Sequence, residues 1–211
     1  MPIITISHQI GSGGREIGQA VARSLGLDYI DQQIIQGVAK QLGINENVAL
    51  EMDEKAQSTV MRVLSAVTGG LQTSVVPYVY TGENAAVDEK EYLEATRKVI
   101  EAAAVSNHAV IAGHGANFAL LGRPSVLNIY LYALKEKRIQ TLMQRDNLNS
   151  SQAAEQVQHN DHDRAHYVKI FYNAEWQNPI HYHLMLNTGV VKPRLATEII
   201  VQAAQDADCC Y

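Results

Sequence analysis

The sequence predicts an α/β fold in which a parallel sheet is covered by helices on both faces. The chain opens with an apolar strand, a glycine-rich loop and an amphipathic helix in direct succession. Further short apolar runs alternate with helical patterns along the chain, and this alternation is typical of parallel sheets. With 211 residues, 46% of them apolar, the chain is long enough for one such domain with an insert.

The predicted elements follow in order from the apolar periodicity. Residues 3–7 are mostly β-branched and apolar, as in a strand that is buried on both faces. Apolar residues at i, i+3, i+4 and i+8 from Ile17 predict a helix between Gly14 and Gly26. A short second strand is predicted at 27–30, and buried strands are predicted at 108–112, 126–131 and 183–187. Further helices are predicted at 34–42 with Gly43 as the stop, at 88–104, and from Ile139 to just before Asn147.

Two stretches do not fit a regular alternation of strands and helices. Residues 45–87 are far longer than a normal crossover, so we interpret them as an inserted region. Residues 148–178 form a polar, His-rich and aromatic helical stretch with few core positions, which we interpret as a lid. The sequence therefore predicts a single domain over 1–211, with its core at 1–44, 88–147 and 179–211.

Charge and cysteine content restrict the partners and the compartment. Lys and Arg number 17 against 22 Asp and Glu, a net charge of −5, which disfavours nucleic acid and acidic membranes and favours a small-molecule partner. Cys209 and Cys210 are neighbours and cannot form a disulfide that links distant parts of the fold. We therefore expect the protein to be located in the reducing cytoplasm. The N-terminus lacks the features of a signal peptide or anchor. The oligomeric state stays open, a homo-oligomer included.

The loop after the first strand has the composition of a phosphate-binding loop. It reads Ser7-His8-Gln9-Ile10-Gly11-Ser12-Gly13-Gly14-Arg15-Glu16. Successive glycines let backbone N–H groups turn toward an anion, and the helix N-terminus that follows adds partial positive charge. An arginine there would add a forked cation. The residues that we expect to bind phosphate are Gly11, Ser12, Gly13, Gly14, Arg15 and Glu16.

Two alternatives to a mononucleotide loop are open at this point. The glycines could serve only a tight strand-to-helix turn. They could also belong to a dinucleotide fold, because Asp31 lies 20 positions after Gly11, where an acidic residue would hold a ribose. The residues Ser7, His8, Gln9 and Ile10 precede the first glycine, Gly11, however, and this wider loop favours the P-loop interpretation over an NAD-dependent oxidoreductase.

Three polar residues are expected at the carboxyl edge of the sheet, where ligands of open α/β sheets bind. Asp31 follows the second strand, although it could instead cap the helix that begins at Gln32. His114 and Asn117 follow the third strand, and each could contact an acceptor or simply hydrogen-bond its own loop.

The sequence resembles the cytidylate kinase-like family over nearly its whole length. The resemblance rests on the segments 4–7 (ITIS), 11–18 (GSGGREIG), 29–31 (YID), 110–117 (VIAGHGAN) and 161–167 (DHDRAHY). It implies a three-layer P-loop NTPase fold with a parallel sheet, an inserted nucleoside-monophosphate-binding region and a helical lid. It also implies phosphoryl transfer from ATP, with Mg²⁺, to a nucleotide such as CMP.

The resemblance also implies roles for individual residues. Arg138, Arg145 and Arg164 would join Arg15 around the transferred phosphates, and Asp161 would orient Arg164 or contact the acceptor nucleotide, together with Asp31, His114 and Asn117. The alternative for each arginine is a solvated helix face.

The chain departs from the family pattern at three positions. Gly14 occupies the place of the Walker A lysine, and His8 and His114 stand where relatives carry arginine. Arg15 could supply the missing charge, but its fixed fork is not equivalent to a mobile ammonium. A second hypothesis is therefore a nucleotide- or phosphate-binding sensor or assembly module without turnover.

A cluster of metal-binding residue types lies in the predicted lid. His159, His162 and His166 accompany Asp161 and Asp163, and His162 and His166 share a helical face. No glutamate follows His162 as it does in H-E-x-x-H, and we therefore expect no metal site there.

Overall fold

The structure is a computed structural model, and it describes residues 3–50, 53, 89–105 and 108–207. Of the predicted insert 45–87, only 45–50 and Asp53 belong to these described residues. Cys209 and Cys210 also lie outside them.

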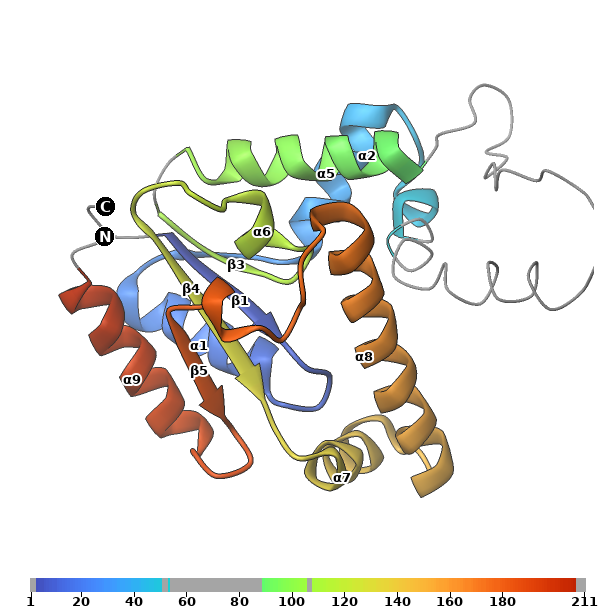
Figure 1. The fold of residues 1–211 in the computed structure, drawn as a ribbon, viewed down its shortest axis with the longest axis vertical. Coiled ribbons are helices and arrows are strands. Elements are labelled where there is room, and N and C mark those ends of the chain that lie inside the picture. Colours follow the sequence, from blue (N-terminus) through green and yellow to red (C-terminus); the bar gives the residue numbers. More distant parts are fainter. Residues whose placement is uncertain (1–2, 51–52, 54–88, 106–107, 208–211) are drawn as a thin grey trace, which may run out of the picture.

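The core is a five-stranded, fully parallel sheet in the order β2-β3-β1-β4-β5 (Figure 1). The strands are β1 (Ile3–His8), β2 (Asp28–Ile30), β3 (Ala109–Ala112), β4 (Val126–Tyr132) and β5 (Leu184–Asn187). β1 is central and pairs with β3 on one side and with β4 on the other. The predicted α/β class and parallel sheet are confirmed.

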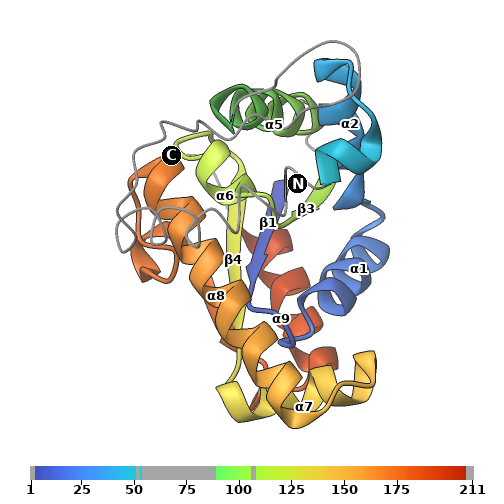
Figure 2. The same ribbon diagram turned by 90° about the vertical axis from the view of Figure 1, so that its right-hand side faces the viewer.

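Helices cover both faces of this sheet. They are α1 (Gly14–Leu25), α2 (Gln32–Leu42), α5 (Glu89–Ala103), α6 (Ala116–Ala119), α7 (Lys135–Asp146), α8 (Ser150–Tyr172) and α9 (Pro193–Asp206), with a 3₁₀ turn η1 (Pro179–His181). Figure 2 shows α5 and α2 on one side of the strands and α1 and α9 on the other. Successive strand side chains point to opposite faces, and the inner strands β1, β3 and β4 are accordingly buried along almost their whole length.

The two cores follow this alternation. Ile3 and Ile111 pack with residues of α2 and α5 in one cluster. Ile4, Ile6 and Val110 pack with residues of α1 and α9 in the other. The continuous apolar runs that predicted strands in the sequence are thus explained by burial on both faces.

The helix ends also agree with the sequence. Gly26 and Gly43 both have a φ of 66° and end α1 and α2 in the left-handed conformation. Glycine adopts this conformation without the steric penalty of a Cβ. α2 begins at Gln32, two residues before its first apolar position, because its opening turn is polar.

α7 and α8 form a helical pair at the carboxyl edge of the sheet (Figure 1). α8 fills 23 residues of the stretch predicted as a lid, and Asn149 opens it with a capping box to Gln152. A small apolar cluster of Leu142, Ala153 and Val157 joins the two helices. The described residues contain no helix that is long and apolar enough to cross a membrane.

Candidate functional site

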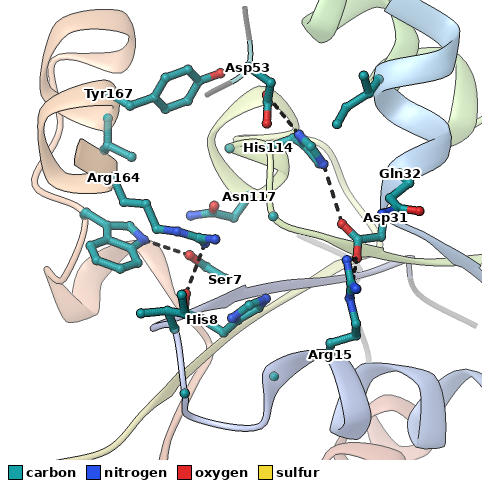
Figure 3. Close-up of a pocket in the computed structure, with 18 of the residues that line it drawn as sticks. Ser7, His8, Arg15, Asp31, Gln32, Asp53, His114, Asn117, Arg164 and Tyr167 are labelled. Carbon is teal, nitrogen blue, oxygen red and sulfur yellow. Dashed lines mark hydrogen bonds and ion pairs between the residues drawn. The ribbon is translucent and has the colours of Figure 1, made fainter. Parts of the chain in front are cut away.

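A cavity of about 620 Å³ opens at the carboxyl ends of β1, β2 and β3. The glycine loop, the start of α2, the β3–α6 connection and α8 form its walls (Figure 3). Its volume is within the usual range for small-molecule sites. The sheet edge that sequence reasoning selected is therefore the edge that carries the cavity.

The glycine loop lines the floor of this cavity. Gly11 and Gly13 have φ values of 77° and 78°, which a side chain would strain, and Gly13 is the N-cap of α1 without any side-chain cap. The N-terminus of α1 therefore suits an anion, because its first N–H groups receive no acceptor from a cap side chain. Ser12 is turned away, because its hydroxyl donates to the Gln9 carbonyl at 2.7 Å.

One wall carries a chain of four charged side chains. The Arg15 guanidinium pairs with Asp31 at 2.9 Å. The His114 ring lies 3.6 Å from Asp31 through Nε2 and 3.2 Å from Asp53 through Nδ1. Figure 3 shows Asp53, His114, Asp31 and Arg15 in succession along this wall. Asp31 makes no side-chain cap to α2, so its carboxylate serves this chain instead of the alternative capping role.

The carboxylates keep the His114 ring charged. Burial opposes protonation, but Asp53 and Asp31 raise the pKa of His114 to about 9. In return, and despite burial, the His114 ring holds the pKa of both carboxyls below their usual value. Tyr92 also donates to Asp53 at 3.2 Å. The wall thus carries two cations and two anions at neutral pH.

Arg164 faces this wall from α8 (Figure 3). Its Nη1 donates to the His8 carbonyl at 3.1 Å, and its guanidinium lies 5.9 Å from the centre of the Trp176 ring. Trp176 is itself fixed by a 2.8 Å hydrogen bond from its indole N–H to Ser7. Within the described part of the chain, Arg164 has no ion pair, and its buried Nε has no hydrogen-bond partner. A partly buried cation without a direct counterion among the described residues suits an anionic ligand.

Asn117 is a second unpartnered donor in the cavity. Its side chain is 3% exposed, and Nδ2 has no hydrogen-bond partner among the described residues. Figure 3 places its amide between His114 and Arg164. Arg164 and Asn117 thus give the cavity lining two buried donor atoms that no described residue satisfies, and such donors suit a polar ligand.

The other predicted arginines have different surroundings. Arg138 is 3% exposed and forms a bidentate pair with Asp161 at 2.9 and 2.6 Å. Its Nε also donates to the Ala133 carbonyl at 3.1 Å. Arg145 lines the cavity rim and pairs with its neighbour Asp146 at 2.7 Å. In this structure, Arg138 ties α7 to α8, and Asp161 binds Arg138 and makes no hydrogen bond to Arg164.

The structure brings ten of the predicted site residues to the cavity. They are Gly11, Gly13, Gly14, Arg15, Glu16, Asp31, His114, Asn117, Arg145 and Arg164. Ser12, Arg138 and Asp161 do not line it. Sequence reasoning missed Asp53, Ser7 and Trp176, since a lone aspartate inside a helical stretch and a tryptophan after a helix carry no local signal for this site.

The histidines of α8 make separate contacts. His159 pairs with Asp163 at 3.0 Å, and the His162 and His166 rings stack with centres 6.4 Å apart. Among the residues that the structure describes, no three His, Cys, Asp or Glu side chains gather to hold a metal ion.

The sequence is similar to known proteins over most of its length. Residues 3–190 match the model of the cytidylate kinase-like family. The chain is 23% identical over 199 residues to a cytidylate kinase from Sulfurisphaera tokodaii, covering 94% of this chain and 92% of the relative.

Two solved structures have the same fold. An uncharacterized protein from Eubacterium ventriosum matches with a TM-score of 0.68 and 15% identity, covering 98% of this chain and 100% of that one. A shikimate kinase from Acinetobacter baumannii, in complex with shikimate, matches with a TM-score of 0.51 and 15% identity, covering 97% and 93%. At this identity the likeness establishes the fold alone.

Proposed function

The chain belongs to the cytidylate kinase-like family, and from this membership we propose that it transfers the γ-phosphoryl group of ATP to a nucleoside monophosphate, with CMP as the first candidate. The observation that carries the proposal is Arg164, a cation in the cavity that has no direct counterion among the described residues. Phosphoryl transfer depends on cations placed around the transferred group, because the reaction needs little covalent chemistry from the protein.

The glycine loop is the proposed donor side. The backbone N–H groups at the start of α1 would hold the ATP phosphates. Glu16 supports Mg²⁺ binding, because it lines the cavity and has no ion pair among the described residues. Mg²⁺ typically binds one or two carboxylates together with substrate phosphates, and it would neutralise part of their charge. Arg145, at the rim, would approach the same phosphates.

Arg164 and Asn117 are the proposed acceptor side. An oxygen of the acceptor phosphate attacks the γ-phosphorus in line, and the bond to the departing ADP oxygen breaks. Arg164 would stabilise the charge on the transferred group, and Asn117 would donate to the acceptor. We propose α8 as the lid. The insert predicted at 45–87 lies mostly outside the described residues, and of its described part Leu50 and Asp53 line the cavity.

A second candidate function is nucleotide binding without turnover. Gly14 in the place of the P-loop lysine favours it, because the lysine normally reaches the β- and γ-phosphates. Such a protein would act as a sensor or assembly module with the same ligands.

ADP formation from ATP and Mg²⁺ across a panel of nucleoside monophosphates separates the two candidates. A kinase produces ADP only with its acceptor, whereas a sensor binds ATP and a monophosphate without forming ADP. Calorimetric titration of the same ligands completes the test. Absence of binding by any nucleotide would refute both candidates.

Arg164→Ala tests whether the Arg164 cation in the cavity contributes to phosphoryl transfer. We expect kcat to fall by about 10³-fold, the effect of removing an arginine from a phosphoryl-transfer site. Arg194→Ala is the matched control, because Arg194 is 90% exposed on α9 and pairs with Glu198 on the same helix. Equal activity of the two variants would contradict the role of Arg164.

A further inference from the structure

The end of β1 places an imidazole where the phosphate-binding loop lacks its usual cation. His8 is the last residue of the central strand, and its backbone is held between a β4 neighbour, Leu131, and the Arg164 guanidinium, which donates to its carbonyl. In the pattern G-x-x-x-x-G-K-[ST], His8 stands at the first glycine and Gly14 at the lysine.

The two departures from the pattern are coupled in space. A Cβ added to Gly14 would lie 2.5 Å from Cβ and 2.6 Å from Cδ2 of His8, and closer still to Cγ. The His8 side chain thus occupies the volume in which a side chain at position 14 would begin. A lysine at position 14 would overlap with the His8 side chain in its present position. His8 itself lines the cavity.

One ring nitrogen is open to a ligand. Nδ1 lies 3.4 Å from the Gln9 carbonyl oxygen, whereas Nε2 has no hydrogen-bond partner in the described part of the chain. A carbonyl neighbour favours the tautomer with the proton on Nδ1, which leaves the Nε2 lone pair available for a second proton.

We propose that His8 provides the cation of the glycine loop in place of the lysine, by taking up a proton at Nε2 when a polyphosphate binds. The proton comes from solvent, the imidazole becomes imidazolium, and its Nε2–H donates to a phosphate oxygen. This proposal rests on the proposed function, since it needs phosphates in the loop.

The charges around His8 agree with a ligand-linked proton. Burial and the Arg164 guanidinium, with a smaller effect of Arg15, lower the pKa of His8 to about 4, against the opposing effects of the Gln9 carbonyl and Asp31. The ring is therefore neutral at pH 7 in the free protein. His114, across the cavity, faces Asp31 and Asp53. A multiply charged phosphate beside the ring reverses this balance, because a nearby anion favours the charged imidazole.

Calorimetric titration with ADP and with inorganic pyrophosphate at pH 7.5 tests the proposal. Repeating each titration in two buffers of different ionisation enthalpy gives the number of protons taken up. We expect uptake of up to one proton per ligand by the wild-type protein, less any proton change of the ligand itself. His8→Asn should remove the part of the proton uptake that is due to His8, and it should weaken binding. His108→Asn, at an exposed position before β3, should match the wild type.

The pH dependence gives a second readout that needs no variant. Between the pKa of His8 in the free protein and its pKa in the complex, affinity should fall by up to tenfold per pH unit as the pH rises. In the double variant His8→Gly, Gly14→Lys, the affinity for the ligand should lack the pH dependence that is due to His8, because lysine is already charged in the free protein. Gly14→Lys alone should bind worse than the double variant, because the two side chains overlap.

The outcomes separate this proposal from the function on which it rests. Binding with proton uptake that disappears in His8→Asn supports it. Binding with the same proton uptake in wild type and His8→Asn overturns the role of His8 and leaves the kinase proposal standing. If the wild-type protein binds neither ADP nor pyrophosphate, both the role of His8 and the proposed kinase function are overturned.

Discussion

Replacing His114 by asparagine should destabilise the protein much more at pH 6 than at pH 9.5. The His114 side chain is 8% exposed, and its ring contacts two carboxylates. The carboxylates raise its pKa from the ordinary 6.5 to about 9, against the opposing effect of burial. At about 1.4 kcal/mol for each tenfold change in proton affinity, this corresponds to about 3 kcal/mol of stability.

The sign follows from the direction of the shift. The folded protein binds this proton more tightly than the unfolded chain, so the stabilisation is fully present below about pH 6.5. It is lost as the pH rises toward about 9, where the folded protein also releases the proton. The destabilisation caused by His114→Asn should therefore be about 3 kcal/mol smaller at pH 9.5 than at pH 6.

Urea denaturation followed by the fluorescence of Trp176 measures this difference. Trp176 is the single tryptophan of the chain and is 3% exposed, so unfolding changes its surroundings. His108→Asn is the control, and it should show the wild-type pH dependence. If His114→Asn costs the same free energy at both pH values, the imidazolium between Asp31 and Asp53 does not stabilise the fold and the reasoning fails.

Three further variants test other contacts. Asp161→Ala should lower the free energy of unfolding by about 3 kcal/mol, because it leaves the Arg138 guanidinium buried and unpaired; a loss below about 1 kcal/mol in urea denaturation would contradict this. Gly37→Ala should cost about 1 kcal/mol despite the better helix propensity of alanine, because its Cβ would lie 2.7 Å from Val99 Cγ1; thermal unfolding should show no such cost in a Val99→Ala background. Arg15→Ala should weaken ADP binding about tenfold by calorimetry if Arg15 contacts phosphate, and unchanged affinity would mean that the backbone amides suffice.

The secondary structure was largely predictable because its signals are local. The apolar run at 126–131 predicts a strand that is β4 in the structure, and Gly26 and Gly43 mark the ends of two helices. These features depend on side-chain periodicity and on single-residue conformational freedom. The glycine loop that lines the cavity could be predicted for the same reason.

The partner of each charged side chain could not be predicted in the same way. Arg138 and Arg164 have similar positions in the sequence, each within a polar helix, and the resemblance gave them the same role. In the structure Arg138 is neutralised by Asp161, whereas Arg164 lacks such a partner among the described residues. The difference depends on which carboxylate the packing of α7 against α8 places opposite each guanidinium.

The sequence by itself determined the parallel α/β architecture, the glycine loop and the sheet edge at which polar residues gather, since strand burial and glycine placement act over a few residues. Tertiary structure alone decided that Asp53 joins His114, 61 positions away, and that the His8 ring takes the space of a side chain at position 14. Contacts of this kind depend on the packing of distant segments at ångström precision, and no local pattern encodes that packing.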